Sequence, residues 1–368
     1  MSHKQVTVRR RVAATAMLAV LLTLVRPVAA HVEYVTDEEA GAGIEFVLEV
    51  LADPLNAVLV GGTGLLAAVG IGVYLWVRPT IPDFVVLRSA LAEYLTYVPW
   101  MLRLSLGLPL IGAGFTGYFF SPSLMTASLE PTAQALLRIF QIGLGFFLLF
   151  GLGTRVVAGI GLTSYVVGVL LAPEIVLALE YIPGFLAIAL LGSGRPSADH
   201  LLIRLGGSKG TYYNRIDPIT PLARKAQRRI DPYTAYVPTI LRVGLGATFI
   251  LLGLGEKLMN PGPGLALVEQ LNLTALIPVS PGMWVVGAGL AEVAFGVALI
   301  LGLFTRATAA GAFILFTITL FGLANDPVLA HITMFGIASA IFTLGSGPLS
   351  VDAWLESQTD RQRDATPA

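Results

Sequence analysis

Nine strongly apolar runs follow one another along this chain of 368 residues. A helix needs about 20 apolar residues to cross the hydrocarbon core of a bilayer, and most of the runs approach that length. They cover residues 55–77, 99–120, 133–152, 156–171, 176–191, 239–259, 283–303, 307–323 and 328–344. Because backbone amides and carbonyls in lipid must pair within the protein, the runs predict an all-α, polytopic membrane protein.

The charge content agrees with this prediction. Only 12% of the residues are charged, whereas a soluble domain carries about 25%. This low charge content favours the lipid bilayer as the partner of the apolar surface. The formal net charge is zero, which argues against a nucleic-acid partner. The chain has no Cys and only four His, which excludes disulfides, thiol catalysis and Cys-ligated iron–sulfur or zinc sites. We expect no metal site, and no cofactor is evident in the sequence.

The first 30 residues have the pattern of a secretion signal. The basic stretch "KQVTVRRR" precedes an apolar run from Val12 to Val25, and Val28-Ala29-Ala30 fits a cleavage site. Two interpretations stay open, a signal peptide that is removed and a signal anchor that is retained. The segment 31–98 then begins with an acidic stretch, residues 31–54, and contains the first span.

Two parts of the chain resemble each other. The stretch "LRLSLGLPLIGAGFTGYFFSP" (102–122) aligns without a gap on "LRVGLGATFILLGLGEKLMNP" (241–261). Further on, "GLGTR" (151–155) matches "GLFTR" (302–306), and "GSGRPSAD" (192–199) matches "GSGPLSVD" (345–352). This internal repeat predicts two tandem four-helix segments, 99–199 and 239–352, preceded by one helix. A linker, 200–238, joins them, and 353–368 is expected to be a frayed polar tail.

The distribution of Lys and Arg predicts the orientation. Cations gather in the loop between the two segments: Arg195, Arg204, Lys209, Arg215, Arg224, Lys225, Arg228 and Arg229. Counting through the spans places acidic loops on the opposite face. The positive-inside rule therefore predicts a cytoplasmic linker and C-terminus, with residues 31–54 outside, in the cell membrane. The linker either contacts anionic lipid headgroups or docks a soluble protein.

With these motifs in view, the chain resembles the DoxX family. The resemblance rests on "LRVGLGATFILLGLGEKL", on "GLFTR" and on "GSGPLSVD". Residues 239–352 resemble a whole DoxX four-helix unit, and 99–199 resemble a degenerate one. The resemblance implies a membrane subunit of a quinone-linked redox complex, associated with thiosulfate or other sulfur anions. It also implies quinone as cofactor and a soluble redox or sulfurtransferase partner.

Four ionisable residues of the second segment align with uncharged residues of the first. They are Glu256, Lys257, Glu292 and His331, aligned with Gly117, Tyr118, Gln141 and Leu179. Ionisable groups inside a span are costly and usually functional. We expect Glu256 or Glu292 to neutralise Lys257 across helices, with His331 adjacent, around an outward-opening pocket. There Lys257 holds an oxyanion and the carboxylate and imidazole relay protons to quinone.

Gly289, Glu292 and Gly296 share one helix face, which points Glu292 into the bundle. The alternative is a charge network that only fixes helix register.

Six charged residues occur in both segments, and we assign them a structural role. They are Arg103, Arg155, Asp199, Arg242, Arg306 and Asp352. At the cytoplasmic ends of spans, the Arg side chains are expected to snorkel and pair with Asp.

Two further functions stay open. One is a carrier or channel for a small anion or metabolite. The other is a non-catalytic scaffold for a soluble partner.

Overall fold

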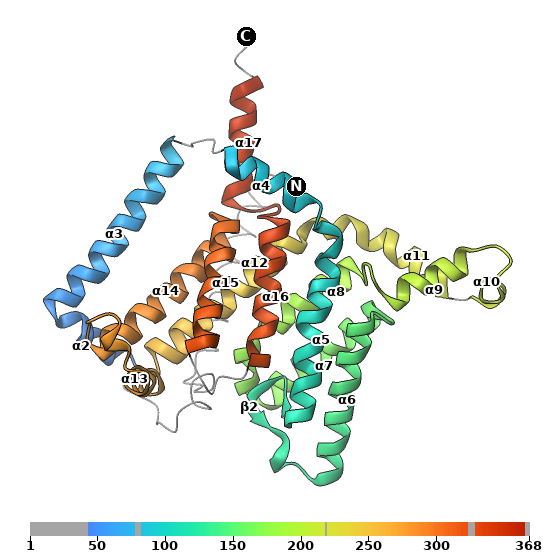
Figure 1. Ribbon diagram of the computed structural model, residues 1–368, viewed down its shortest axis with the longest axis horizontal. Helices are drawn as coiled ribbons and strands as arrows, with labels where there is room; N and C mark the ends of the chain where they lie inside the picture. The colour runs from blue at the N-terminus through green and yellow to red at the C-terminus, as the bar shows by residue number, and fades with distance from the viewer. Residues whose placement is uncertain (1–42, 78–81, 218, 323–327, 365–368) are drawn as a thin grey trace, which may run out of the picture. The chain divides into compact units, whose positions relative to one another are not determined.

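The computed structural model describes residues 43–77, 82–217, 219–322 and 328–364 (Figure 1). The signal sequence expected at 1–30 lies outside the described residues. The described residues fall into two compact units. The smaller unit contains 43–63 and 249–293, and the larger unit contains 64–248 and 294–364.

Helices of membrane-crossing length recur along the described chain. Six helices are long and apolar enough: Pro54–Val77, Leu95–Thr116, Pro131–Phe150, Thr154–Leu171, Thr220–Leu258 and Pro281–Leu301. Three shorter apolar helices are Tyr181–Leu191, Thr305–Phe321 and His331–Leu344. Each of the nine overlaps one of the apolar runs in the sequence. The all-α, polytopic membrane fold is therefore confirmed.

The first four-helix segment lies in the larger unit. Its helices are α5 (Val98–Thr116), α6 (Pro131–Phe150), α7 (Thr154–Leu171) and α8 (Tyr181–Leu191). A short antiparallel hairpin, β1 (Tyr118–Phe119) and β2 (Ser121–Met125), follows α5. Gly117 ends α5 in the left-handed conformation, with φ of 91°, which suits a residue without Cβ. Short 3₁₀ turns are η1 (Leu95–Tyr97), η2 (Thr126–Ser128) and η3 (Pro173–Ala178).

The second four-helix segment differs after its first helix. α12 (Val237–Leu251) continues into a π-helical segment, η5 (Leu252–Leu258), and α13 (Pro261–Gln270) and η6 (Leu273–Ala275) come next. The remaining spans are α14 (Pro281–Leu301), α15 (Thr305–Gly322) and α16 (Val328–Leu344). α12 and α14 each begin in one compact unit and end in the other.

Glycines allow close helix contact at matching places in the two segments. A Cβ added at Gly107 of α5 would lie 2.9 Å from the carbonyl oxygen of Gly145 in α6. A Cβ added at Gly246 of α12 would lie 2.6 Å from the carbonyl oxygen of Gly296 in α14. Small residues at such crossings let backbones in lipid approach and gain dispersion energy.

Within the larger unit, the two segments pack against each other through equivalent residues. α5 lies along α16, where a Cβ at Gly336 would overlap Ser105. A Cβ at Gly244 of α12 would overlap Pro183 of α8. The sequence alignment pairs Ser105 with Gly244 and Pro183 with Gly336. The first helix of each segment therefore contacts the last helix of the other.

Helices also occur outside the nine spans. α2 (Ile44–Ala52) belongs to the smaller unit, and α4 (Pro82–Ala92) belongs to the larger one. The linker contains α9 (Ala198–Gly207), α10 (Tyr212–Ile216), α11 (Ile219–Ile230) and η4 (Asp231–Tyr236).

The expectation of a frayed C-terminal tail is wrong over most of its length. Residues Val351–Asp364 form the helix α17, which is capped by Ser350, whose Oγ accepts the Ala353 amide at 3.0 Å.

Candidate functional site

An ion pair lies in the smaller unit between Lys257 of η5 and Glu292 of α14. The Lys257 Nζ is 2.9 Å from Glu292 Oε1 and 3.0 Å from Oε2. The two side chains are only 21% and 14% exposed. Of the two carboxylates that the sequence offered as partners for Lys257, the structure therefore selects Glu292 for the direct contact. The functional role of the pair stays a prediction.

The π-helical turn accounts for the position of Lys257. Its wider winding is visible in the bond from the Met259 amide to the Leu254 carbonyl, 2.8 Å long and five residues apart. Gly253 and Gly255 give the backbone freedom to adopt this winding. π-Helical turns are rare and frequently occur at functional sites. The sequence alone predicted a regular helix here, because nothing in its periodicity separates the two windings.

Apolar groups and glycines surround the ion pair. A Cβ at Gly253 would lie 2.7 Å from the Gly289 carbonyl oxygen and 3.1 Å from the Glu292 Cβ. A Cβ at Gly289 would meet the Leu258 side chain at 2.8 Å. η5 and α14 therefore nearly touch, and this contact directs Glu292 towards η5 as the Gly289-Glu292-Gly296 pattern predicted. In such surroundings a charge is poorly screened, so each group depends on the other.

Glu256 and His331 are also buried, with exposed fractions of 2% and 4%. Glu256 precedes Lys257 in η5 and attracts its ammonium electrostatically. His331 lies on α16 in the larger unit. Because the two units are described separately, the predicted proximity of His331 to Lys257 stays a prediction.

The first segment has a neutral contact at the matching positions. Gln141 of α6 aligns with Glu292, and Tyr118 aligns with Lys257. The Gln141 Nε2 donates to the Tyr118 carbonyl at 3.2 Å, and its Oε1 accepts the Phe120 amide at 3.3 Å. The same two positions are therefore in contact in both segments. In the first segment a side-chain amide binds a backbone carbonyl, and in the second two charged side chains form an ion pair.

The arginines shared by both segments close helix ends. Arg103 is 1% exposed and donates to the carbonyls of Leu148 and Leu149 at 2.8 Å each. Arg242 is fully buried and donates to the equivalent carbonyls of Leu299, at 3.1 Å, and Ile300. Further bonds go to the chain after the last span: Arg103 to Ser193 and Pro196, and Arg242 to Ser346, Pro348 and Leu349.

The expected snorkelling is not seen, because Arg103 and Arg242 are buried. Asp199 attracts Arg103 and Asp352 attracts Arg242 electrostatically, but the ion pairs within the described residues do not join them. Asp199 instead accepts the amides of Gly153 and Thr154 at 2.7 and 2.9 Å. Asp352 accepts the amides of Phe304 and Thr305 at 2.9 and 2.8 Å. Each Asp thus caps the start of the third helix of its segment, where free amides favour an anion.

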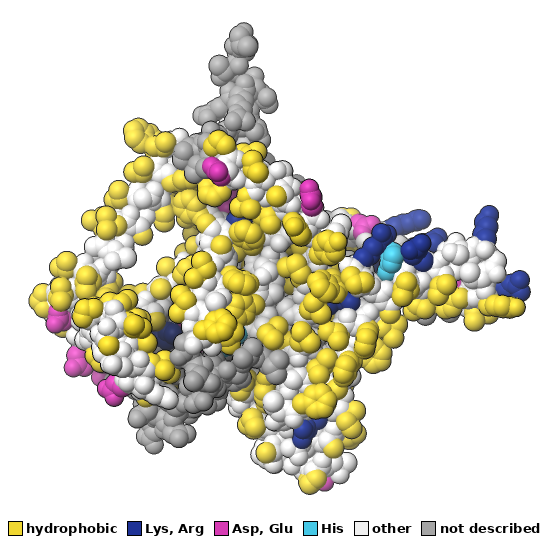
Figure 2. All heavy atoms as spheres, viewed as in Figure 1, with side chains coloured by type: hydrophobic (Ala, Val, Ile, Leu, Met, Phe, Trp, Pro, Cys, Tyr) yellow, Lys and Arg dark blue, Asp and Glu magenta, His cyan; other side chains and the backbone are white. Residues whose placement is uncertain are grey.

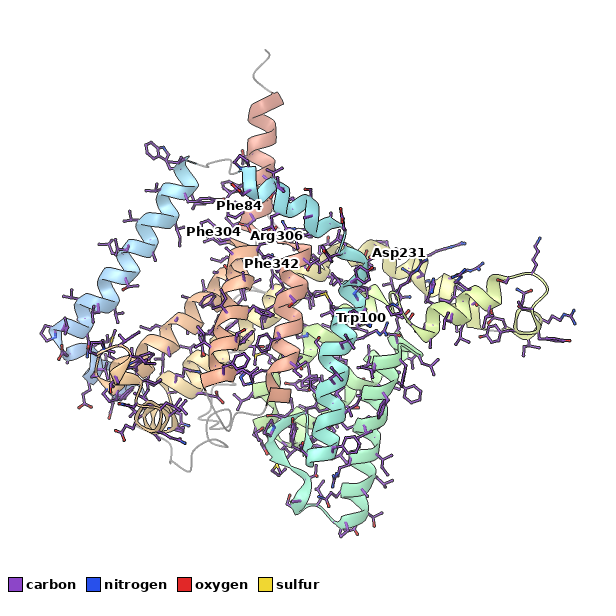
Figure 3. All side chains as sticks on the ribbon, viewed as in Figure 1. Phe84, Trp100, Asp231, Phe304, Arg306 and Phe342 are labelled. Atoms are coloured by element: carbon purple, nitrogen blue, oxygen red, sulfur yellow. The ribbon has the colours of Figure 1, made fainter. Side chains whose placement is uncertain are left out.

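Arg155 and Arg306 bind the last turns of α8 and α16 in the same manner. Arg155 donates to Ala189 and Leu190 at 2.9 and 3.1 Å, and Arg306 to Phe342 and Thr343 at 2.9 and 3.3 Å. The cation is favourable at a helix C-terminus, where carbonyls lack amide partners. In Figure 3, Phe304, Arg306 and Phe342 lie together at one end of α15 and α16.

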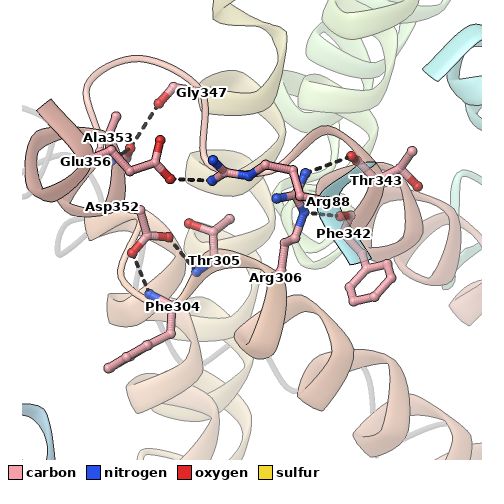
Figure 4. A network of polar contacts seen from close by, with 11 residues as sticks. Arg88, Phe304, Thr305, Arg306, Phe342, Thr343, Gly347, Asp352, Ala353 and Glu356 are labelled. Atoms are coloured by element: carbon pink, nitrogen blue, oxygen red, sulfur yellow. Dashed lines mark hydrogen bonds and ion pairs between the residues drawn. The ribbon is translucent and has the colours of Figure 1, made fainter. Parts of the chain in front are cut away.

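A cavity of about 390 Å³, lined by both charged and apolar side chains, opens beside Arg306 in the larger unit. Arg88 of α4 and Glu356 of α17 form an ion pair at its wall (Figure 4). The loop 345–348 supplies another wall. Both partners of the Arg88–Glu356 pair are more than half exposed, so the pair contributes little stability. The sequence did not offer Arg88 or Glu356 as site residues, because both lie outside the apolar spans.

A buried acid of the first segment, Glu180, was not among the residues singled out in the sequence. Glu180 is only 3% exposed at the start of α8. Among the described residues, its Oε2 has no hydrogen-bond partner. Aromatic rings gather here: Phe120 lies 5.3 Å from Tyr165 and 5.0 Å from Tyr181 between ring centroids. A carboxyl within the run 176–191 was the signal that could have revealed this buried acid.

A family model matches the part of the chain that carries the ion pair. No curated protein and no solved structure matches the chain. The family model for DoxX matches residues 237–325. That range contains η5 and α14, and the resemblance seen in the sequence is supported there. Residues 237–325, which carry the Lys257–Glu292 ion pair, therefore match the DoxX family.

Proposed function

We propose that the chain is a DoxX-like integral membrane subunit of a quinone-linked redox complex, with the Lys257–Glu292 pair as its site. The observation that carries this proposal is a partly exposed ion pair on a π-helical turn, among apolar groups, inside the segment that matches DoxX. Ionisable groups kept in such surroundings are more often functional than structural.

The residues of the site suit a quinone. The Lys257 ammonium can donate a hydrogen bond to a carbonyl oxygen, and Glu292 can hold or release a proton. Their exposed fractions of 21% and 14% leave edges of both groups reachable. A bound quinone supplies two-electron, two-proton chemistry, and the protein supplies charge and orientation. The same ammonium suits a small oxyanion such as thiosulfate.

The proposal includes a duplicated architecture. Residues 99–199 and 239–352 are two copies of one four-helix unit, supported by the equivalent contacts of Arg103 and Arg242. The first copy is degenerate at the site, since Gln141 stands where the second has Glu292.

The proposed complex has a soluble partner. Without Cys and with four His, the chain offers few ligands for a redox metal, so electrons reach the site from a soluble redox or sulfurtransferase partner. In the cell membrane, the cation-rich linker and the C-terminus face the cytoplasm, as the positive-inside rule favours.

Quinone reduction by thiosulfate in isolated membranes tests this function. We expect Glu292→Gln to abolish reduction, whereas Glu269→Gln retains it, because Glu269 is an exposed acid of α13. Normal reduction with normally folded Glu292→Gln contradicts the proposed site. Uptake of thiosulfate into proteoliposomes without an electron donor supports the carrier alternative instead. Loss of partner recruitment alone, on neutralising linker cations, supports a scaffold.

A further inference from the structure

The linker forms a folded arm with two chemically different sides. We call residues 198–230 the linker arm; it contains α9, α10 and α11. Ser197 caps α9 through its Oγ, which accepts the His200 amide at 3.1 Å, and Thr211 caps α10 by accepting the Asn214 amide at 3.2 Å. Asn214 donates to the Gly206 carbonyl, which ties α10 to α9. The arm is therefore an ordered element.

Seven cations lie on this arm, and all are exposed. They are Arg204, Lys209, Arg215, Arg224, Lys225, Arg228 and Arg229. Only two acids, Asp199 and Asp217, occur in the same range, and Asp199 is bound to the start of α7. The ion pairs formed within the described ranges include none of the seven cations. Their charge is thus available to an anionic partner.

His200 adds no charge at neutral pH. Its pKa is lowered from the ordinary value of 6.5 by loss of hydration and by the neighbouring charges of Arg195 and Arg204.

Large apolar side chains are exposed beside these cations. Tyr212 and Ile216 of α10 are 86% and 76% exposed, Leu222 of α11 is 69% exposed, and Leu201 and Leu205 of α9 are also exposed. In Figure 2, Lys and Arg gather along one edge and the tip of the arm, and hydrophobic side chains follow the other edge. An exposed apolar edge rimmed by cations is the pattern of a helix that lies in a membrane interface.

Apolar spans flank the arm on both sides. It follows α8, and η4 joins it to the start of α12, so an apolar span lies next to each end. Figure 1 shows α9 and α11 projecting sideways from the ends of α5 and α8. The apolar edge in Figure 2 faces the direction in which α6 extends. The apolar edge of the arm therefore lies on the side towards which this apolar span runs.

We propose that the linker arm binds anionic phospholipid headgroups as an interfacial element, with its apolar edge inserted at the headgroup boundary. Charge complementarity and the two flanking spans identify the bilayer as the occupant. Each Lys or Arg close to an anionic lipid surface should raise the equilibrium constant for docking of the arm about fivefold. This proposal does not depend on the quinone function.

The absence of Cys makes a direct test simple. Single variants Ile216→Cys and Leu222→Cys of the full chain are labelled with nitroxide and placed in phosphatidylcholine nanodiscs, with or without phosphatidylglycerol. Ser357→Cys on α17 is the matched control at an exposed polar position. We expect both arm labels to become accessible to oxygen and shielded from a water-soluble nickel chelate when phosphatidylglycerol is present. The control label stays in water.

Neutralising the cations separates charge from apolar insertion. Replacing Arg224, Lys225, Arg228 and Arg229 with Gln should lower the ratio of docked to undocked arm about fivefold for each cation. Raising the salt concentration with the unchanged arm should act in the same direction, because salt screens exposed charges. If both arm labels stay exposed to water with and without phosphatidylglycerol, the proposal is wrong. That result favours a soluble partner for the arm. If the arm labels are inserted to the same extent with and without phosphatidylglycerol, at high salt and in the fourfold variant, the proposed binding of anionic headgroups is wrong.

Discussion

Lys257 and Glu292 each stabilise the other's charge on helices that nearly touch. Breaking a buried pair by removing one partner leaves an uncompensated charge, whereas removing both leaves none. The exposed fractions of 21% and 14% place this pair closer to the buried than to the surface case. The asymmetry between single and double replacement is therefore a measurable property of the site.

Lys257→Met should lower the stability of the detergent-solubilised chain by about 3 kcal/mol, because Glu292 stays without its cation. The double variant Lys257→Met with Glu292→Met should recover most of this loss. Thermal unfolding of the wild type and the two variants measures both effects. Equal losses in the single and the double variant contradict a mutually dependent pair.

Replacing Glu180 should have the opposite effect on stability to replacing Lys257. One carboxyl oxygen of Glu180 has no hydrogen-bond partner among the described residues. Burying it therefore costs free energy that hydrogen bonds do not fully offset. Glu180→Met, which keeps the length of the side chain, should leave the melting temperature unchanged or raise it. Gln141→Met is the comparison, since it removes the bonds to Tyr118 and Phe120 and should lower stability. A lower melting temperature for Glu180→Met is the contrary result.

At the scale of elements, the contact of α5 with α16 is set by one missing Cβ. Gly336→Ala should destabilise the chain because the new Cβ overlaps Ser105. Gly159→Ala on α7 meets no atom within 4 Å and should stabilise the helix by up to about 1 kcal/mol. Thermal unfolding compares the two. Adding Ser105→Gly to Gly336→Ala should restore stability, and failure of this rescue argues against the contact.

The stability of the first turn of α6 should depend on pH, because Glu130 caps this helix. Its pKa is lowered from 4.5 by hydrogen bonds from the amides of Thr132 and Ala133. A lowered pKa in the folded state gives stability that is present above pH 4.5 and is lost as pH falls through the lower folded value. Glu130→Gln should therefore melt earlier than wild type at pH 7. This difference should vanish in acid, and a difference that persists there refutes the assignment.

The spans could be predicted from the sequence, but the local structure between them could not. In lipid, a run of about 20 apolar residues can pair its backbone amides and carbonyls within itself only as a helix. The runs could therefore be predicted to be helical. After Gly117 the chain turns into a hairpin, whereas at the matching place η5 continues as a π-helix. That choice depends on tertiary contacts, such as Gln141 with Tyr118 and Glu292 with Lys257. The burial of Arg103 was missed because its carbonyl partners come from distant helix ends.

At the scale of the molecule, the chain combines a DoxX-matching segment with an equivalent set of contacts in residues 99–199. The structural Arg and Asp residues occur in both segments, and the Lys257–Glu292 pair occurs only in the second. This division matches the proposal of one working site on a doubled scaffold. It predicts that the double variant Lys257→Met with Glu292→Met, which leaves no unpaired charge, changes quinone binding while leaving the fold in place.

The most direct test is the quinone content of the chain after purification from native membranes. Organic extraction followed by chromatography gives moles of quinone per mole of protein. The account predicts that wild type and Glu269→Gln retain quinone, whereas Glu292→Gln and the stable double variant Lys257→Met with Glu292→Met lose most of it. Equal quinone content in all four proteins contradicts a site at Lys257 and Glu292.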